Sequence, residues 1–152
     1  CAREMLRLAE ERGLPLLLPE DAVTAGEVKE GVPTSTLSVD RIPPDALGLD
    51  IGPATRIRFR EVLRTARTIL WNGPMGVFEI PTFAEGTRSV TEDLVAAHAR
   101  GATSVVGGGD SAAAVAHFGL EDRVGHVSTG GGASLEFFEG RSLPGVEPLV
   151  RG

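Results

Sequence analysis

The sequence of 152 residues contains one cysteine, one lysine and no long apolar run. The lone Cys1 excludes a framework of internal disulfides and a cysteine-based structural zinc site. The only lysine, Lys29, does not close a glycine-rich loop, so the Walker A motif of P-loop NTPases is absent. The longest clearly apolar stretch, residues 14–19, is much shorter than the ~18–20 residues that cross a bilayer. These absences exclude a disulfide scaffold, a P-loop enzyme and a transmembrane protein.

Positive charge is also scarce. The 15 lysines and arginines face 21 acidic residues, which gives a formal net charge of −6. A chain with this balance is not attracted non-specifically to nucleic acid or to anionic lipid, so we expect neither a nucleic-acid partner nor a membrane partner. A bound polyanion would have to be met locally, by backbone N–H groups, a metal ion or a few arginines.

The chain begins within a helical pattern. Ala2, Met5, Leu6 and Ala9 lie on one helical stripe, yet no Ser, Thr, Asp or Asn precedes them as an N-cap. We therefore expect the chain to be cut inside or just before this helix, and to be a fragment of a longer protein. Its length and its 41% of hydrophobic residues still allow one domain with a core.

Strands and helices are predicted to alternate along the chain. We expect helices from the N-terminus to Gly13, from Pro53 onward, and at 84–100 and 111–118, with a short one through Phe137; residues 40–50 read as a proline-rich connection. Strands are predicted at 14–18, 34–39, 68–71, 103–106 and 124–127. This alternation predicts an α/β fold of three layers, a Rossmann-like parallel sheet between helices, present here as an incomplete domain.

Two glycine triplets, Gly107–Gly109 and Gly130–Gly132, each follow a predicted strand and open a predicted helix. In an open parallel sheet, ligands bind outside the carboxyl ends of the strands, where both triplets fall. The free N–H groups and the dipole of a helix N-terminus attract anions, so two such turns predict a phosphate-binding crevice. The alternative is that glycine serves only the geometry of tight turns.

Asp110 follows the first triplet. A carboxylate beside a phosphate site repels the ligand unless a cation lies between them, and Mg²⁺ is commonly held by one or two carboxylates together with phosphates. Asp110 is therefore a candidate Mg²⁺ ligand. The alternative is that it caps the helix.

Two other motifs overlap the same loop. Gly107, Gly109 and Ala112 fit the G-x-G-x-x-A pattern of an NAD(P)-binding oxidoreductase domain, but no acid stands about 20 residues on to bind a ribose. Gly109, Ser111 and Ala113 approach the G-x-S-x-G nucleophile elbow of an α/β hydrolase, with His126 downstream, although the second small residue is alanine. A purely structural α/β module is the third alternative.

The loop after the 68–71 strand carries two further candidates. Glu79 can accept hydrogen bonds from ribose hydroxyls, and Asn72 can donate to a phosphate. The alternative for Glu79 is an ordinary solvated loop residue. Trp71, Phe78 and Phe83 are expected in the core.

Four segments together carry a resemblance. They are Gly48–Pro53 (GLDIGP), Trp71–Glu79 (WNGPMGVFE), Gly107–Ser111 (GGGDS) and His126–Ser134 (HVSTGGGAS). In this order and spacing they resemble the latter part of the C-terminal, nucleotide-binding domain of phosphoglycerate kinase, and the resemblance covers essentially the whole chain.

The resemblance implies phosphoryl transfer between 1,3-bisphosphoglycerate and ADP, forming 3-phosphoglycerate and ATP, with Mg²⁺. It implies a cytoplasmic glycolytic enzyme that is a monomer when intact. The N-terminal domain, which binds the acid substrate, and the first part of the C-terminal domain are absent, so residues 1–152 are expected to be inactive alone. The site residues that it implies are Gly48, Leu49 and Val77 for adenine; Glu79 for ribose; Asn72, Gly108, Gly109, Asp110 and Ser111 for the phosphates; Asp110 for Mg²⁺; and the amides of Gly109 and Gly132 for the transferring group.

Overall fold

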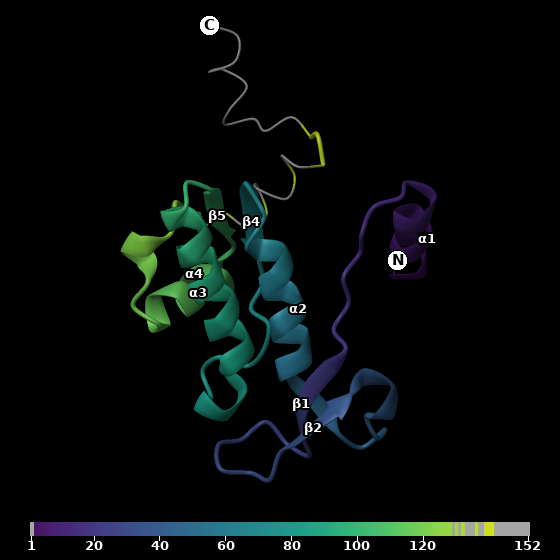
Figure 1. Ribbon diagram of the computed structural model, residues 1–152. Helices are drawn as coiled ribbons and strands as arrows, with labels where there is room; N and C mark the ends of the chain where they lie inside the picture. The colour runs from purple at the N-terminus through teal and green to yellow at the C-terminus, as the bar shows by residue number, and fades with distance from the viewer. Residues whose placement is uncertain (1, 129, 131, 133–135, 137–138, 142–152) are drawn as a thin grey trace, which may run out of the picture.

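A computed structural model describes residues 2–128, 130, 132, 136 and 139–141 (Figure 1). The elements, in chain order, are α1 (Ala2–Glu11), β1 (Asp21–Ala25), β2 (Ser35–Ser38), η1 (Val39–Arg41), β3 (Leu47–Ile51), α2 (Pro53–Leu63), β4 (Thr68–Asn72), η2 (Pro81–Phe83), α3 (Glu85–Ala99), β5 (Thr103–Gly107), α4 (Gly109–His117), η3 (Glu121–Arg123) and β6 (His126–Ser128). Within these ranges no helix is long and apolar enough to cross a membrane. The short helix expected through Phe137 falls largely outside the described residues.

A parallel sheet of three strands, in the order β4-β5-β6, forms the centre of the larger part of the molecule. Asn72 pairs with Gly107, and Gly107 pairs with Ser128, so the carboxyl ends of the three strands lie at one edge. Helices α3 and α4 both pack on β5, and α2 packs on α3 (Figure 1). The predicted α/β fold with a parallel sheet is confirmed.

The core of this part is built by apolar residues that the local patterns identified. Leu94 of α3, Val106 of β5 and Val115 of α4 are fully buried, and Trp71 is 5% exposed. Phe78 and Phe83 are buried as expected. Glycine ends α3 as predicted, because Gly101 adopts a φ of 92°, which side chains with a Cβ rarely adopt.

A second sheet was not predicted. It is antiparallel, with the order β2-β1-β3, and lies at the bottom of Figure 1. The strand expected at 34–39 is confirmed as β2, but the prediction that 40–50 is entirely a connection was wrong, because β3 begins at Leu47. Strands β1 and β3 contain buried polar residues, among them Asp21, Thr24 and Asp50, and so lack the apolar pattern of a strand.

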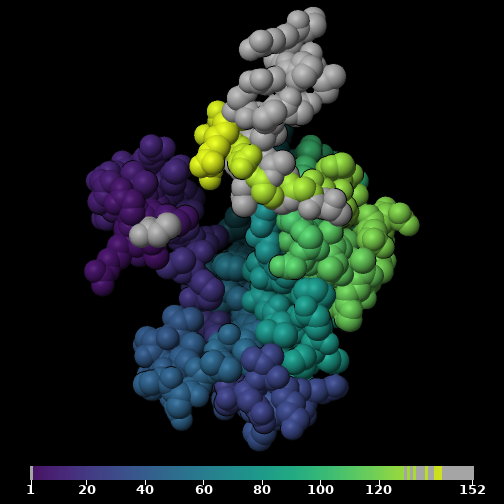
Figure 2. Space-filling view, turned by 180° about the vertical axis from the view of Figure 1, so that it is seen from behind, coloured from purple at the N-terminus to yellow at the C-terminus, as the bar shows by residue number. Residues whose placement is uncertain are grey.

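The strand predicted at 14–18 does not form. Residues 14–19 carry no regular structure, and Leu14, Leu16 and Leu18 are 59%, 43% and 52% exposed. Helix α1 forms where it was predicted but buries none of its residues, and it protrudes from the side of the molecule (Figure 2). An apolar segment becomes a strand only where a neighbouring strand pairs with it, and no strand in the described part of the chain lies beside this one.

Asp21 joins the antiparallel sheet to α2. Its carboxylate accepts hydrogen bonds from the N–H groups of Ala54 and Thr55, at 3.0 and 2.8 Å, and from the Thr55 hydroxyl at 2.7 Å. Burial alone would raise the pKa of Asp21, but these bonds from Thr55 and Ala54 outweigh burial and lower it. Asp21 therefore satisfies the free N–H groups at the start of α2 from a neighbouring strand.

Candidate functional site

A cleft of about 650 Å³ lies between β3 and the loop of residues 74–79, with the start of α4 at its edge. Among the residues that line it are five of the predicted site residues: Gly48, Leu49, Val77, Glu79 and Asp110. These come from three segments that are distant in sequence. The structure therefore brings together one group of the residues that the sequence singled out.

The two facing walls of the cleft are tied together by the backbone. The N–H of Val77 donates to the carbonyl oxygen of Leu49, with 3.0 Å between the atoms. Leu49 is buried, Val77 is half-buried, and Glu79 is exposed two residues further along. An apolar slot with one polar group at its mouth suits a flat ring carrying a hydroxylated substituent.

A second group of predicted residues lies at the carboxyl ends of the parallel strands. The N–H of Gly73 donates to Ser111 Oγ at 2.6 Å, and the N–H of Gly108 donates to the carbonyl oxygen of Ser128 at 3.0 Å. Gly108 has a φ of 99°, and its α-carbon faces the Asn72 side-chain amide. Helix α4 then starts at Gly109, so the first N–H groups of the helix open at this edge of the sheet.

Asp110 is the residue that the two groups share. Asn72, Gly108, Gly109 and Ser111 do not line the 650 Å³ cleft, whereas Asp110, in the first turn of α4, does. The N-cap of α4 is Gly108, so Asp110 does not occupy the capping position that the alternative interpretation gave it. Its side chain is exposed and makes no hydrogen bond or ion pair within the described residues.

The cleft is acidic. Asp50, Glu79 and Asp110 are among its lining residues, and no lysine or arginine is. An anionic ligand would therefore bind with a cation between itself and these carboxylates. The described residues contain no cluster of three or more potential metal ligands. An exposed carboxylate beside the amides of a helix N-terminus fits Mg²⁺ that takes its remaining ligands from phosphates and water.

Ser111 does not have the geometry of a hydrolase nucleophile. Its side chain is 1% exposed, and its oxygen already accepts the Gly73 N–H. A nucleophile elbow instead presents an exposed Oγ at the top of the sheet. The hydrolase alternative is therefore not favoured.

Gly132 lies apart from the cleft lining. It is exposed, and a Cβ added to it would meet nothing within 4 Å. Its neighbours at 131 and 133–135 are outside the described residues. Gly109 is equally open, so neither glycine is required here by close packing of other atoms.

Sequence reasoning missed two residues that build the cleft. Asp50 lines it from β3, and Thr87 of α3 accepts the N–H groups of Met75 and Gly76 at 3.1 and 3.2 Å. A signal for Asp50 was present, since it is an acid between apolar residues in GLDIGP. Nothing in the sequence around Thr87 distinguishes it from other helical threonines.

Comparisons with known proteins agree with one another. The family profile described as phosphoglycerate kinase matches residues 1–141. The chain is 56% identical over 148 residues to a phosphoglycerate kinase of Dictyoglomus turgidum and 53% identical to one of Chlorobium luteolum; each match covers 97% of this chain. The solved structure of phosphoglycerate kinase from Coxiella burnetii superposes with a TM-score of 0.89 at 38% identity over 96% of the chain. The structure from Pyrococcus horikoshii OT3 gives 0.76 at 33% identity over 93%.

The matches cover only part of each relative. This chain spans about 37% of the length of the Dictyoglomus and Chlorobium proteins and 37% of the Coxiella chain.

Proposed function

Since this chain belongs to the phosphoglycerate kinase family, we propose that it supplies the nucleotide-binding half of a kinase that transfers a phosphoryl group between 1,3-bisphosphoglycerate and ADP. The reaction forms 3-phosphoglycerate and ATP. Residues 1–152 are then part of the C-terminal domain of a two-domain enzyme, and the acid substrate binds on an N-terminal domain outside this chain. We propose that the intact enzyme is a cytoplasmic monomer.

The observation that carries this proposal is the convergence of Gly48, Leu49, Val77, Glu79 and Asp110 on one cleft. Gly48, Leu49 and Val77 form an apolar slot of the kind that binds an adenine ring, and Glu79 at its mouth accepts hydrogen bonds from ribose hydroxyls. An ADP molecule in this orientation directs its phosphates toward the start of α4.

The phosphates are met by the ends of the parallel strands. Asn72 donates a hydrogen bond from its side-chain amide, and residues 108–111 present the N–H groups of the first turn of α4. Ser111 holds Gly73 in place and so fixes the spacing of the two loops. Asp110 is the residue that would hold Mg²⁺, whose charge offsets that of the phosphates and of the acidic cleft.

Catalysis in such a site is a matter of position and electrostatics. The backbone N–H groups of Gly109 and Gly132 stabilise the charge on the transferring phosphoryl group, which moves between two oxygen atoms held in line. No side chain of this segment has to form a covalent intermediate.

Titration of the full-length kinase chain that carries these residues tests the proposal. We expect saturable MgADP binding, weakened by Glu79→Gln and unaffected by Glu30→Gln, an exposed acid distant from the cleft lining. NAD(H) should not bind. Saturable NAD(H) binding without ADP binding would instead identify a dinucleotide-binding domain.

A further inference from the structure

A buried carboxylate in the lining of the cleft forms no ion pair within the described residues. Asp50 is 4% exposed, and no lysine or arginine in the described residues forms an ion pair with it. Its Oδ1 accepts the N–H of Ile51 at 2.8 Å, and its Oδ2 accepts the N–H of Gly86 at 2.6 Å. A carboxylate buried without an ion-pair partner is costly, so its presence inside the fold indicates a task that an apolar side chain would not perform.

The surrounding backbone is shaped to fit this carboxylate. A Cβ added to Gly76 or to Gly86 would overlap the Asp50 side chain. Gly76 belongs to the 74–79 loop of the cleft, and Gly86 belongs to the first turn of α3. The carboxylate is therefore enclosed by the loop on one side and by the helix on the other.

Thr87 completes the connection between that helix and the loop. Its side chain is fully buried, and its oxygen accepts the N–H groups of both Met75 and Gly76. Asp50 fixes the first turn of α3 on β3, and Thr87 fixes the loop on that turn. Val77, the next residue of the loop, returns to β3 through its bond to Leu49.

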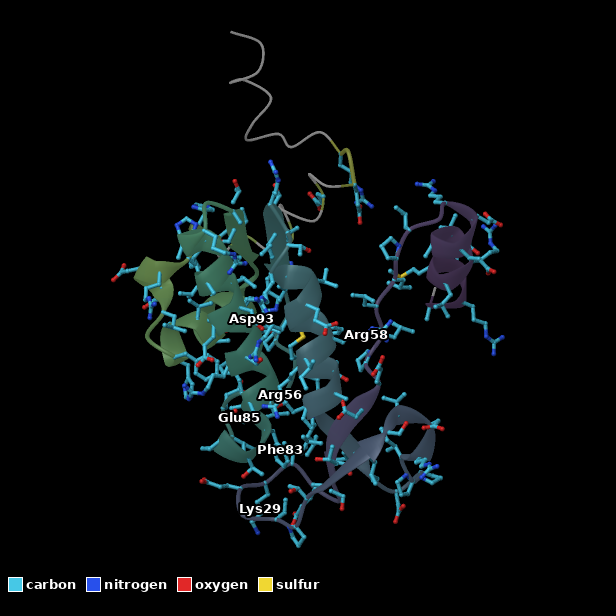
Figure 3. All side chains as sticks on the ribbon, in the orientation of Figure 1. Lys29, Arg56, Arg58, Phe83, Glu85 and Asp93 are labelled. Atoms are coloured by element: carbon cyan, nitrogen blue, oxygen red, sulfur yellow. The ribbon has the colours of Figure 1, made fainter. Side chains whose placement is uncertain are left out.

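Leu49 and Val77, the two proposed walls of the adenine site, are thus connected directly by a hydrogen bond and indirectly through Asp50, α3 and Thr87. Both oxygens of Asp50 are occupied by backbone N–H groups, so this carboxylate acts on the nucleotide through the loop. Arg56 of α2 and Glu85, the first residue of α3, lie next to each other and form an ion pair of 3.4 Å (Figure 3). Arg56 is half-buried, and its charge acts to lower the pKa of Asp50, but it forms no ion pair with that carboxylate.

We propose that Asp50 and Thr87 are positioning residues that set the spacing between β3 and the 74–79 loop, and thereby the affinity for the adenosine part of the nucleotide. The inference rests on the proposed function. It concerns residues that do not themselves touch the reacting phosphoryl group.

The test compares variants of the full-length kinase. Asp50→Asn keeps the size of the side chain but turns an NH₂ group toward one of the two N–H donors, so one hydrogen bond is lost. We expect KM for ADP to rise about tenfold, in keeping with the loss of one hydrogen bond to a charged group. The KM for 1,3-bisphosphoglycerate should stay unchanged.

Asp21→Asn is the matched control. Asp21 is likewise a buried carboxylate of the antiparallel sheet that accepts N–H groups at a helix start, but its helix, α2, does not hold the loop. We expect Asp21→Asn to lower Tm without changing KM for ADP. If Asp50→Asn lowers Tm and leaves KM for ADP at the unsubstituted value, the proposal is wrong.

Thr87 provides a second variant that keeps the proposal testable if Asp50→Asn fails to fold. Thr87→Val removes the acceptor, whereas Thr87→Ser retains it. We expect Thr87→Val to raise KM for ADP and to speed hydrogen exchange at the N–H groups of Met75 and Gly76, and Thr87→Ser to restore both. Equal behaviour of the two variants would overturn the role of the hydroxyl.

Failure of the proposed function has a different signature. It would appear in the unsubstituted kinase, as an absence of MgADP binding. Failure of the positioning role appears only in the variants, against an unsubstituted protein that binds MgADP.

Discussion

The hydroxyl oxygen of Ser111 accepts a hydrogen bond from the backbone N–H of Gly73, with 2.6 Å between the two atoms. This bond joins the loop after β4 to the first turn of α4, 38 positions away in the sequence. The two loops that present groups to the proposed phosphate site are thereby held in register. A serine that the sequence presented as a possible nucleophile is a connector between loops.

Replacing this connector should cost stability. Ser111→Ala leaves the N–H of Gly73 without its acceptor, and we expect the free energy of unfolding to fall by about 1–3 kcal/mol. Urea denaturation measures this. Ser104→Ala is the matched control, because Ser104 is equally buried and accepts the N–H of Gly125 at 2.8 Å, remote from the site. Both variants should be destabilised, but only Ser111→Ala should also weaken ADP binding.

The buried position of Ser111 also predicts that a fluorophosphonate probe does not label it. Labelling of Ser111 would return the hydrolase interpretation to consideration.

Substitution of Asp110 should change the binding of the metal ion rather than the stability of α4. Asp110→Asn retains the size of the side chain and loses the charge that attracts a cation. We expect affinity for MgADP to fall more than affinity for metal-free ADP, measured by calorimetric titration with and without Mg²⁺. Asp122→Asn, an exposed acid in η3, serves as the control and should change neither. If Asp110→Asn reduced both affinities by the same factor, Asp110 would not be a metal ligand.

The two buried carboxylates of the antiparallel sheet should give opposite pH dependences. The pKa of Asp21 is lowered in the fold, so its contribution to stability is present above its ordinary pKa of 3.8 and is lost as pH falls through the folded value. Burial raises the pKa of Asp50 to about 6, against the opposing effect of the Gly86 and Ile51 N–H groups. The folded state therefore holds the Asp50 proton more tightly than the unfolded chain does, and this contribution fades as pH rises from about 4 to about 6.

Unfolding curves between pH 3 and pH 8 check both signs, at about one unit spacing. The stability of the unsubstituted protein relative to Asp21→Asn should increase with pH, and its stability relative to Asp50→Asn should decrease. Parallel slopes for the two differences would contradict the opposite environments of the two groups.

The fold could be predicted from the sequence wherever neighbouring residues decide the structure. Helix α3 and strand β5 were located correctly because the apolar pattern before Gly101 and the Thr103–Val106 run are local signals. Strands β1 and β3 were missed because Asp21 and Asp50 are polar inside them, and each of these carboxylates accepts a hydrogen bond from a residue more than 30 positions away. The prediction of a strand at 14–18 was wrong for the opposite reason. Its apolar pattern is a local signal, but no strand in the described part of the chain lies beside it.

The same distinction applies to the site. Glycine turns and the acids near them are visible in the sequence, which is why the sequence alone singles out Glu79 and Asp110. The role of Thr87 depends on two backbone groups reaching its oxygen from another segment, and no side-chain pattern encodes that approach. The residues that we propose to bind the nucleotide could be found from the sequence; the residues that hold them in place could not.

The 152-residue chain alone should show no kinase turnover. Holding both substrates in line is worth about 7–11 kcal/mol of the activation barrier, and on the proposed function one substrate site lies outside this chain. A coupled assay of ADP phosphorylation checks this, with circular dichroism to establish that the chain is folded. Turnover near that of an intact phosphoglycerate kinase would contradict the proposed division of the two sites.

Substitution of Gly132 distinguishes a role in the geometry of the turn from a role in phosphoryl transfer. A Cβ at this position meets nothing within 4 Å, so Gly132→Ala should leave Tm of the full-length kinase nearly unchanged. If the Gly132 N–H faces the transferring group in the closed complex, the added methyl group obstructs that approach. By analogy with the loss of one oxyanion-hole donor, kcat should then fall on the order of 10²–10³-fold while the Kd for ADP stays close to its original value.

Gly119→Ala is the control for Gly132→Ala. Gly119 has a φ of 65°, which strains any side chain, so Gly119→Ala should lower Tm and leave kcat unchanged. An unaltered kcat in Gly132→Ala would remove this N–H from the catalytic groups.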